Sequence, residues 1–178
     1  MLELYSERLK IRTLQPEDWP LFLSIQQDPQ LNQFVRAPDS LEVNRAKFDS
    51  RLQPWQFESG EWLTLTIEEI STGQAVGFTG FYASNLALAQ VEVGYMLGQD
   101  GQGKGYATES LSAVIDWACL AFQVHKFIGV CAQGNKASQR VLEKCGFQLE
   151  GVLRHNYKLA QQWVDDCYYG LLAHERSC

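Results

Sequence analysis

A glycine-rich loop that leads into a long amphipathic helix constrains the fold of this chain most. Residues 98–105 contain four glycines and follow a predicted strand over residues 91–97. From Ala107 to Phe122, apolar side chains recur at helical spacing and form one stripe, which must pack against a sheet or another helix. Glycines let the backbone approach a ligand, and the first N–H groups of a helix have no partner inside it. The loop is therefore either a phosphate-binding turn or a plain surface turn.

The remaining pattern predicts a mixed α/β (α+β) fold with one sheet flanked by helices, in a single domain over residues 1–178. Alternating or continuous apolar residues predict strands over residues 7–14, 63–68, 75–83, 91–97, 127–132, 147–154 and 164–173. Further helices are expected to begin near Pro16 and to span residues 41–52 and 137–144. Asp39 and Glu42 have capping-box spacing before the helix over residues 41–52, and Gly94 marks a bulge or a close backbone approach.

The composition excludes several classes of protein. Acidic residues outnumber basic ones 21 to 15, and the net charge of −6 argues against a broad nucleic-acid-binding face. No apolar run reaches the roughly 18 residues of a membrane-spanning helix, and the charged N-terminus does not resemble a secretory signal. The five cysteines form no C-x-x-C pair, which indicates thiols in a reducing cytoplasm rather than disulfides or a zinc site. We expect a cytoplasmic protein that uses no metal and binds neither nucleic acid nor membrane.

Three phosphate-binding motifs can be compared with the loop. The dinucleotide pattern G-x-G-x-x-G fails, because its last position is Tyr106 or Thr108. The P-loop pattern fails at Gly105, where a Ser or Thr would hold magnesium, so an NTPase or kinase-like phosphate binder is disfavoured. The third pattern, Q/R-x-x-G-x-G/A, is matched in full by residues 102–107.

The match to the third pattern and its surroundings resemble the GNAT N-acetyltransferases. The resemblance is closest to the subgroup of ribosomal-protein N-terminal (serine/alanine) acetyltransferases, and it covers nearly the whole chain. It is carried by the runs ERLKIR at 7–12, GYML at 94–97, GYATE at 105–109, NKAS at 135–138, VLEKCGF at 141–147 and YGLL at 169–172. The family implies a mixed, mostly antiparallel sheet with splayed central strands, and acetyl-CoA as cosubstrate.

The resemblance also implies which residues contact acetyl-CoA. Backbone amides from Gln102 to Ala107 would hold the diphosphate, with Lys104 as an added charge or a solvated surface residue. The cofactor-contacting residues it implies are Met96, Leu97, Gln102, Gly103, Lys104, Gly105, Tyr106, Ala107, Thr108, Asn135 and Ser138. The alternative role of Asn135 is that of the N-cap of a helix, with no contact to the cofactor.

The general acid and base are assigned with alternatives. Many family members carry a tyrosine that acts as the general acid seven residues after the asparagine that corresponds to Asn135, but this chain has Leu142 at that position. Ser138 is the replacement that the subgroup implies, and Tyr157 is the alternative. Glu92, on the strand that should hold the thioester, is the candidate base. Asp165 matches an acidic position of the subgroup and would hold the substrate or order the last strand.

The acceptor is argued from the cost of deprotonating an amine. At pH 7 an α-amine with a pKa of about 8 costs about 1 kcal/mol to deprotonate, whereas a lysine near 10.4 costs about 4–5 kcal/mol. A single carboxylate acting as general base is therefore sufficient to deprotonate an α-amine, such as a ribosomal-protein N-terminus. Polyamines, aminoglycosides and amino acids remain alternatives, as does a non-catalytic acyl-CoA sensor. A homodimer is expected from the family alone.

Overall fold

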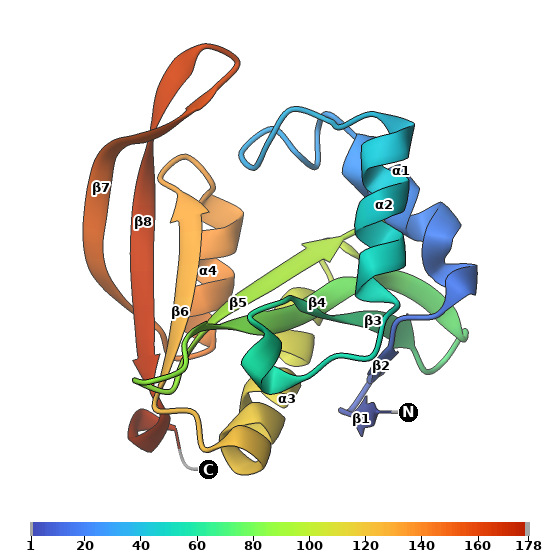
Figure 1. Ribbon diagram of the computed structural model, residues 1–178, viewed down its shortest axis with the longest axis horizontal. Helices are drawn as coiled ribbons and strands as arrows, with labels where there is room; N and C mark the ends of the chain where they lie inside the picture. The colour runs from blue at the N-terminus through green and yellow to red at the C-terminus, as the bar shows by residue number, and fades with distance from the viewer. Residues whose placement is uncertain (1, 177–178) are drawn as a thin grey trace.

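A computed structural model describes residues 2–176 as one sheet with helices on both faces (Figure 1). The strands are β1 (Glu3–Tyr5), β2 (Leu9–Thr13), β3 (Leu63–Glu69), β4 (Gln74–Asn85), β5 (Gln90–Leu97), β6 (Lys126–Ala132), β7 (Gln148–Leu159) and β8 (Gln162–Leu172). The helices are α1 (Trp19–Gln27), α2 (Leu41–Arg51), α3 (Tyr106–Phe122) and α4 (Lys136–Lys144). Short 3-10 turns span Pro16–Asp18, Phe57–Ser59, Gln99–Gly101 and Ala173–Glu175. The mixed α/β architecture expected from the sequence is confirmed.

The sheet has the order β1-β2-β3-β4-β5-β6-β8-β7. Its pairs are antiparallel except for β5 and β6, which run parallel and are joined through α3. The hairpin expected between residues 63–68 and 75–83 is present as β3 and β4. The mostly antiparallel sheet implied by the family resemblance is therefore confirmed.

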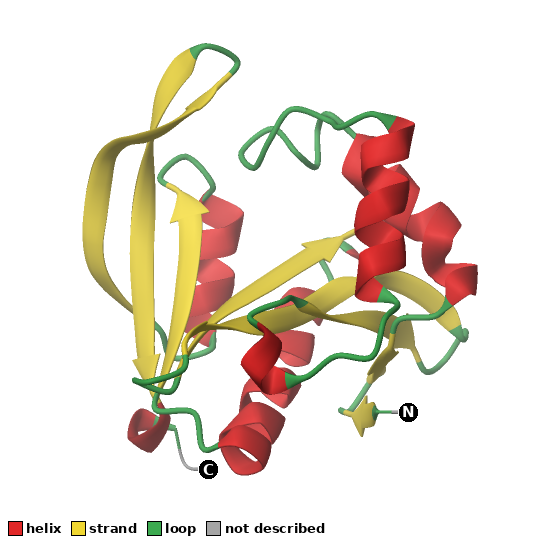
Figure 2. Cartoon of the chain, in the orientation of Figure 1, coloured by secondary structure: helices red, strands yellow, loops and turns green. Residues whose placement is uncertain are grey.

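Two helix layers cover opposite faces of the sheet. Alternate residues of β5 separate them: Val93 and Tyr95 lie on the face of α3 and α4, whereas Glu92 and Met96 lie on the face of α1 and α2. The larger core packs the apolar stripe of α3 on the sheet, and a smaller aromatic core joins α1 and α2 to β4. Figure 2 shows the helices in red and the strands in yellow, with the long loop from α1 to α2 at the top of the view.

Several local expectations differ from the structure. The N-cap of α2 is Ser40, whose hydroxyl accepts from the Val43 N–H at 3.3 Å, whereas Asp39 pairs with Lys47 at 3.0 Å. The capping box at Asp39 is therefore wrong by one residue. Gly94 lies in continuous register opposite Gly80, so it marks no bulge. It is a close approach, because a Cβ there would lie 2.9 Å from the Trp62 ring.

The ends of some elements were also misjudged. The short strand β1 was missed, and the chain after Pro16 first forms a 3-10 turn before α1 begins at Trp19. Strands β7 and β8 extend beyond their expected inner ends as a largely exposed hairpin, in which Tyr157 and Leu159 are half-buried. Among residues 2–176, no helix is long and apolar enough to cross a membrane. Cys131, Cys145 and Cys167 are buried thiols and Cys119 is partly buried; Cys178 lies outside the described residues.

Candidate active site

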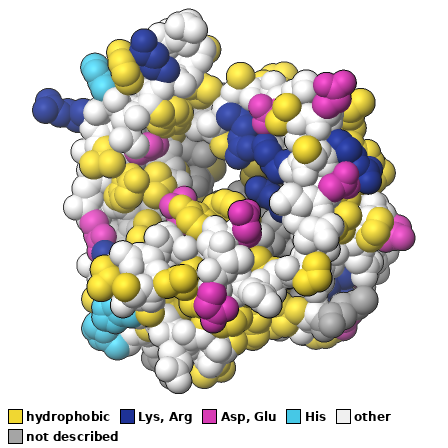
Figure 3. Space-filling model, in the orientation of Figure 1, with side chains coloured by type: hydrophobic (Ala, Val, Ile, Leu, Met, Phe, Trp, Pro, Cys, Tyr) yellow, Lys and Arg dark blue, Asp and Glu magenta, His cyan; other side chains and the backbone are white. Residues whose placement is uncertain are grey.

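The two parallel strands at the centre of the sheet diverge and open a cleft. They pair only through three residue pairs, from Gln90–Lys126 to Glu92–Ile128. Beyond Glu92, the edges that β5 and β6 turn towards each other have no strand partner in the described chain (Figure 1). The resulting cleft has a volume of ≈ 1150 Å³, and Figure 3 shows it as a hollow at the centre of this face. The splayed central strands expected from the family are thus present.

The glycine-rich loop forms an amide cradle at the open end of this cleft. Gly103 and Gly105 have φ of +73° and +82°, a left-handed conformation that glycine adopts without strain. Within residues 2–176, the N–H groups of Gly103, Lys104 and Gly105 donate to no acceptor, and those of the first turn of α3 are free by helix geometry. The Gln102 N–H, which was also expected to contact the diphosphate, donates to the Gln99 carbonyl at 3.2 Å. Free amides at a helix N-terminus are suited to a diphosphate.

Two side chains of the loop brace it rather than enter the cleft. The Lys104 ammonium lies 3.9 Å from Glu69, and the Tyr106 hydroxyl donates to Glu69 at 2.7 Å. Tyr106 is buried, and Arg8 stacks over its ring. These two residues offer the cleft their backbone N–H groups, while their side chains fix the loop to β3.

Ser138 lies on the wall of the cleft formed by α4. Asn135 is the N-cap of that helix and accepts from the Ser138 N–H at 3.1 Å, so its structural role is realised while it also lines the cleft. The Ser138 hydroxyl lies 2.7 Å from the hydroxyl of Tyr95 on β5. Tyr95 also donates to the Ser138 carbonyl at 3.1 Å, and burial raises the pKa of this tyrosine. The two hydroxyls form a connected pair across the cleft, and the sequence reasoning missed Tyr95 although it quoted the strand that carries it.

The position of the usual family tyrosine is part of the core. Leu142 is buried, and a Cβ at Gly129 would overlap its methyl groups, so it packs α4 onto β6. The alternative acid, Tyr157, lines the cleft, but its hydroxyl donates to the Phe34 carbonyl at 2.9 Å. That bond ties the tip of the α1–α2 loop to β7 and occupies the proton of Tyr157.

Glu92 lies on the other face of β5, in a partly buried position of the cleft. Burial raises the pKa of its carboxyl, a hydrogen bond from the Tyr82 hydroxyl at 3.0 Å lowers it, and the negative charge of Asp166 raises it again. The net shift is upward from the ordinary value of 4.5. A carboxylate with a raised pKa in a cleft is a suitable proton acceptor.

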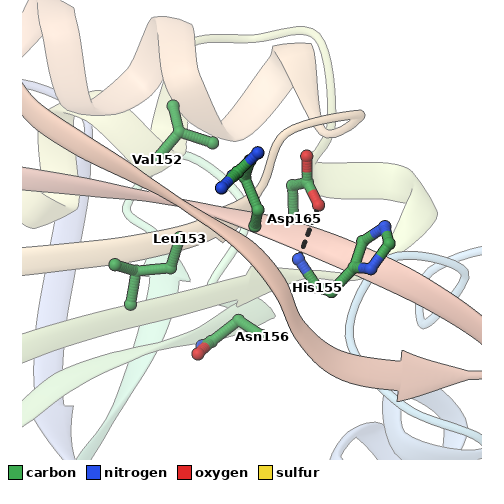
Figure 4. A pocket seen from close by; sticks show the side chains of 6 residues that line it. Val152, Leu153, His155, Asn156 and Asp165 are labelled. Atoms are coloured by element: carbon green, nitrogen blue, oxygen red, sulfur yellow. Dashed lines mark hydrogen bonds between the residues drawn. The ribbon is translucent and has the colours of Figure 1, made fainter.

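Asp166 is an acidic residue of the cleft that the sequence reasoning did not identify. Its neighbour Asp165 is the residue that the sequence analysis singled out. Asp165 accepts a hydrogen bond from the backbone N–H of His155 at 2.7 Å and orders the β7–β8 hairpin (Figure 4). The pairing of β7 with β8 is irregular between Leu153 and Tyr157. In this irregular stretch the Asn156 side chain donates a hydrogen bond to Asp166 at 2.8 Å. Alternation along β8 could have indicated that only one of the two aspartates faces the cleft, but the bulge opposite them is invisible in the sequence.

Four aromatic residues around the sheet fall into two groups, one at the cleft and one away from it. Trp62 lines the cleft on the Glu92 face, with its ring 4.8 Å from that of Tyr82. Trp55, Phe57 and Phe81 pack with Phe122 at the far end of α3, away from the cleft. The described residues contain no group of three or more His, Cys, Asp or Glu side chains arranged to hold a metal ion.

Comparisons with known proteins agree with this geometry. The family model described as acetyltransferase (GNAT) domain matches residues 8–148. An uncharacterized N-acetyltransferase of Bacillus licheniformis, p20, is 26% identical over 175 residues, which cover 98% of each chain. The solved structure of RimL, a ribosomal L7/L12 alpha-N-protein acetyltransferase in complex with coenzyme A, aligns with a TM-score of 0.84, 21% identity and coverage of 96% of this chain and 98% of its own. A spermidine N-acetyltransferase from Vibrio cholerae, solved with CoA and spermine, aligns with a TM-score of 0.83, 17% identity and coverage of 96% and 98%.

Proposed function

Since the chain belongs to the GNAT acetyltransferase family, we propose that it transfers the acetyl group of acetyl-CoA directly to the α-amine of a protein or peptide N-terminus. The observation that carries this proposal is the cleft between β5 and β6, with unpaired strand edges inside and an amide cradle at its open end. Both features are what a long, anionic, amide-containing cosubstrate needs.

The cradle and the strand edge would together bind acetyl-CoA. Amides from Gly103 to Thr108 would hold the diphosphate, helped by the positive end of the α3 dipole. The unpaired edge of β5, including Met96 and Leu97, would pair with the amide groups of the pantetheine arm. A backbone N–H of the same edge would stabilise the oxyanion that forms on the thioester carbonyl.

The chain's side chains would then move two protons. Glu92 accepts the proton that the amine loses as its nitrogen attacks the carbonyl carbon. Ser138 donates a proton to the sulfur as the carbon–sulfur bond breaks, so the products are an amide and free coenzyme A thiol. Tyr95 positions the Ser138 hydroxyl, because the two oxygens lie 2.7 Å apart. Ser138 is preferred to Tyr157 because either hydroxyl can be the donor in its 2.7 Å contact with Tyr95, whereas the Tyr157 hydroxyl donates to the Phe34 carbonyl.

An α-amine is favoured over a more basic amine by the scarcity of general bases. The cleft offers Glu92 and the hydrogen-bonded Asp166, and a single base suffices for an amine with a pKa of about 8. The likeness to RimL supports a protein acceptor, whereas the likeness to the spermidine enzyme supports the polyamine alternative. A protein acceptor suits this cleft better, because its lining also carries basic side chains, which repel a polyamine.

The test is release of free thiol from acetyl-CoA with a panel of amines. N-terminal peptides should release thiol with a higher kcat/KM than spermidine, an aminoglycoside or free lysine. Preference for spermidine or an aminoglycoside would replace the proposed acceptor. Binding of coenzyme A in calorimetry without thiol release from any amine would instead support a non-catalytic sensor.

The expected homodimer stays a prediction that the exposed edge strand supports. Strand β7 lies at the edge of the sheet and exposes Leu149, Val152 and Leu153. Light scattering on the eluting full chain measures its mass, and a monomer at micromolar concentration would contradict the expectation.

A further inference from the structure

Two arginines without ionic partners lie on the wall of the cleft that faces the acceptor. Arg36 follows α1 in the loop to α2, and Arg51 is the last residue of α2. Both line the cleft, and Arg51 is half-buried, with its guanidinium 5.8 Å from the centre of the Phe22 ring. Figure 3 shows basic side chains gathered along the rim of the hollow beside α1 and α2.

Neither guanidinium is neutralised by the chain. Among residues 2–176, no carboxylate lies within ion-pair distance of Arg36 or Arg51, and neither side chain donates a hydrogen bond. The pKa of Arg51 is lowered to about 10, mainly by burial and then by repulsion from Arg36, while the charge of Glu61 opposes the shift. An arginine keeps its charge in proteins, so a desolvated pair of like charges is a standing cost that a bound anion would remove.

The two arginines lie on the face opposite to the cradle for acetyl-CoA. The smaller core that joins α1 and α2 to β4 includes Phe22 and contacts Met96, which shares its face of β5 with Glu92. The amide cradle belongs to α3, on the other face. An anion at Arg36 and Arg51 would therefore lie on the same face of the sheet as Glu92, towards which the amine must arrive.

A buried amide adds a second polar group to this wall. Gln26, near the end of α1, lines the cleft and is only 5% exposed. Its carbonyl oxygen has no partner in the described chain, and its nitrogen makes only a long contact of 4.0 Å with the sulfur of Met96. An amide held in this way can turn either end towards a ligand.

We infer that Arg36 and Arg51 bind a carboxylate of the acceptor, so that the preferred substrate is a peptide whose N-terminal residues are acidic. The inference rests on the proposed transfer to an α-amine and specifies its substrate. Glu92 and Asp166 on one side of the cleft face the amine, and the arginines on the other side face the carboxylate. The forked guanidinium of arginine donates two parallel hydrogen bonds to the two oxygens of a carboxylate. A neutral amide of the same shape has only one oxygen and no charge, so it cannot take the place of the carboxylate.

The experiment uses three C-terminally amidated peptides that differ only at their second and third positions, which carry aspartate, asparagine or lysine. Thiol release by the full chain should show a kcat/KM about 10- to 100-fold higher for the aspartate peptide than for the asparagine peptide, because charged hydrogen bonds distinguish them. Arg51→Gln and Arg36→Gln should each raise KM for the aspartate peptide and leave kcat nearly unchanged. The asparagine peptide reports in the same samples whether each variant is folded and active.

Arg45→Gln is the matched control on the same helix. Arg45 is exposed, pairs with Asp49 at 2.9 Å and does not line the cleft, so its loss should change neither KM nor kcat. Calorimetry with the coenzyme A complex measures peptide binding separately from turnover. The same method should give an unchanged Kd of acetyl-CoA for Arg51→Gln.

Several outcomes would overturn the inference. Equal kcat/KM for the aspartate and asparagine peptides, or preference for the lysine peptide, would refute the carboxylate site while leaving acetyl transfer to an α-amine intact. Weaker acetyl-CoA binding by Arg51→Gln would assign the arginines to the cosubstrate instead. Failure of every peptide alongside efficient acetylation of spermidine would refute the proposed acceptor and this inference together.

Discussion

Loss of the Tyr95 hydroxyl should reduce turnover only when the Ser138 hydroxyl is present. Tyr95→Phe keeps the ring and removes an oxygen that lies 2.7 Å from Ser138 Oγ and 3.1 Å from the Ser138 carbonyl. A general acid contributes about 10²- to 10⁴-fold to rate, so Ser138→Ala should lower kcat by about 100-fold. Because Tyr95 acts only through Ser138, Tyr95→Phe should lower kcat by about 10-fold, and the double variant should be no slower than Ser138→Ala. The missing factor of about 10 corresponds to a coupling energy of about 1.4 kcal/mol.

The assay is thiol release at saturating acetyl-CoA and acceptor, with thermal unfolding measured on the same samples. Tyr95→Phe should lose about 1 kcal/mol of stability, which is about 2–4 °C in Tm for a chain of this size. Tyr169→Phe is the matched control, since it removes a buried hydroxyl that donates to Glu143 at 3.1 Å and does not line the cleft. It should show a similar loss of stability and an unchanged kcat. Multiplicative effects of about 1000-fold in the double variant, or wild-type turnover by Ser138→Ala, would refute the hydroxyl pair as the acid.

Two further predictions concern the cradle and the base. Gly105→Glu should abolish measurable acetyl-CoA binding in calorimetry, because it places a carboxylate at the diphosphate site and strains a backbone with φ of +82°. Gly73→Glu, at φ +69° in an open hairpin turn, controls for backbone strain and should bind acetyl-CoA with the wild-type Kd. Equal losses in both variants would contradict the placement of the cosubstrate. Glu92 must be ionised to accept a proton, and burial raises its pKa, so kcat should fall with decreasing pH through a value above the ordinary 4.5. Asp166→Asn removes a negative charge that raises the pKa of Glu92, so the acidic limb of the kcat–pH profile should move to lower pH. Glu92→Gln should abolish this limb. An acidic limb that stays at the same pH in Asp166→Asn would show that Asp166 does not raise the pKa of Glu92.

Much of the fold follows from local patterns in the sequence. The helical stripe after residue 105 and the alternation in residues 63–83 were sufficient to predict α3 and the β3–β4 hairpin, because burial of one face imposes a period on the chain. Residues 154–163 gave too weak a signal, since the hairpin that they form is largely exposed. The N-cap of α2 was misplaced because Asp39 and Ser40 both have the required oxygen, and only backbone geometry chose between them.

The site divides in the same way. The glycine positions that allow φ above +70°, the Asn135 cap and the replacement of the usual tyrosine by Leu142 are properties of the sequence, because each depends on a single residue and its neighbours along the chain. The pairing of Tyr95 with Ser138, 43 residues apart, could not be read from the sequence. It requires that β5 and β6 separate after Glu92, which is decided by the packing of helices on both faces of the sheet.

The same holds for the charges that line the cleft. Asp166 faces it, rather than Asp165, because β7 carries a bulge opposite, and Arg36 and Arg51 meet there because α1 and α2 fold back over Phe78. The sequence by itself thus determined the elements and the loop that can hold a diphosphate, since these are local. Only the tertiary structure decided which distant side chains share the cleft, since that depends on strand register and helix packing between segments far apart in the chain.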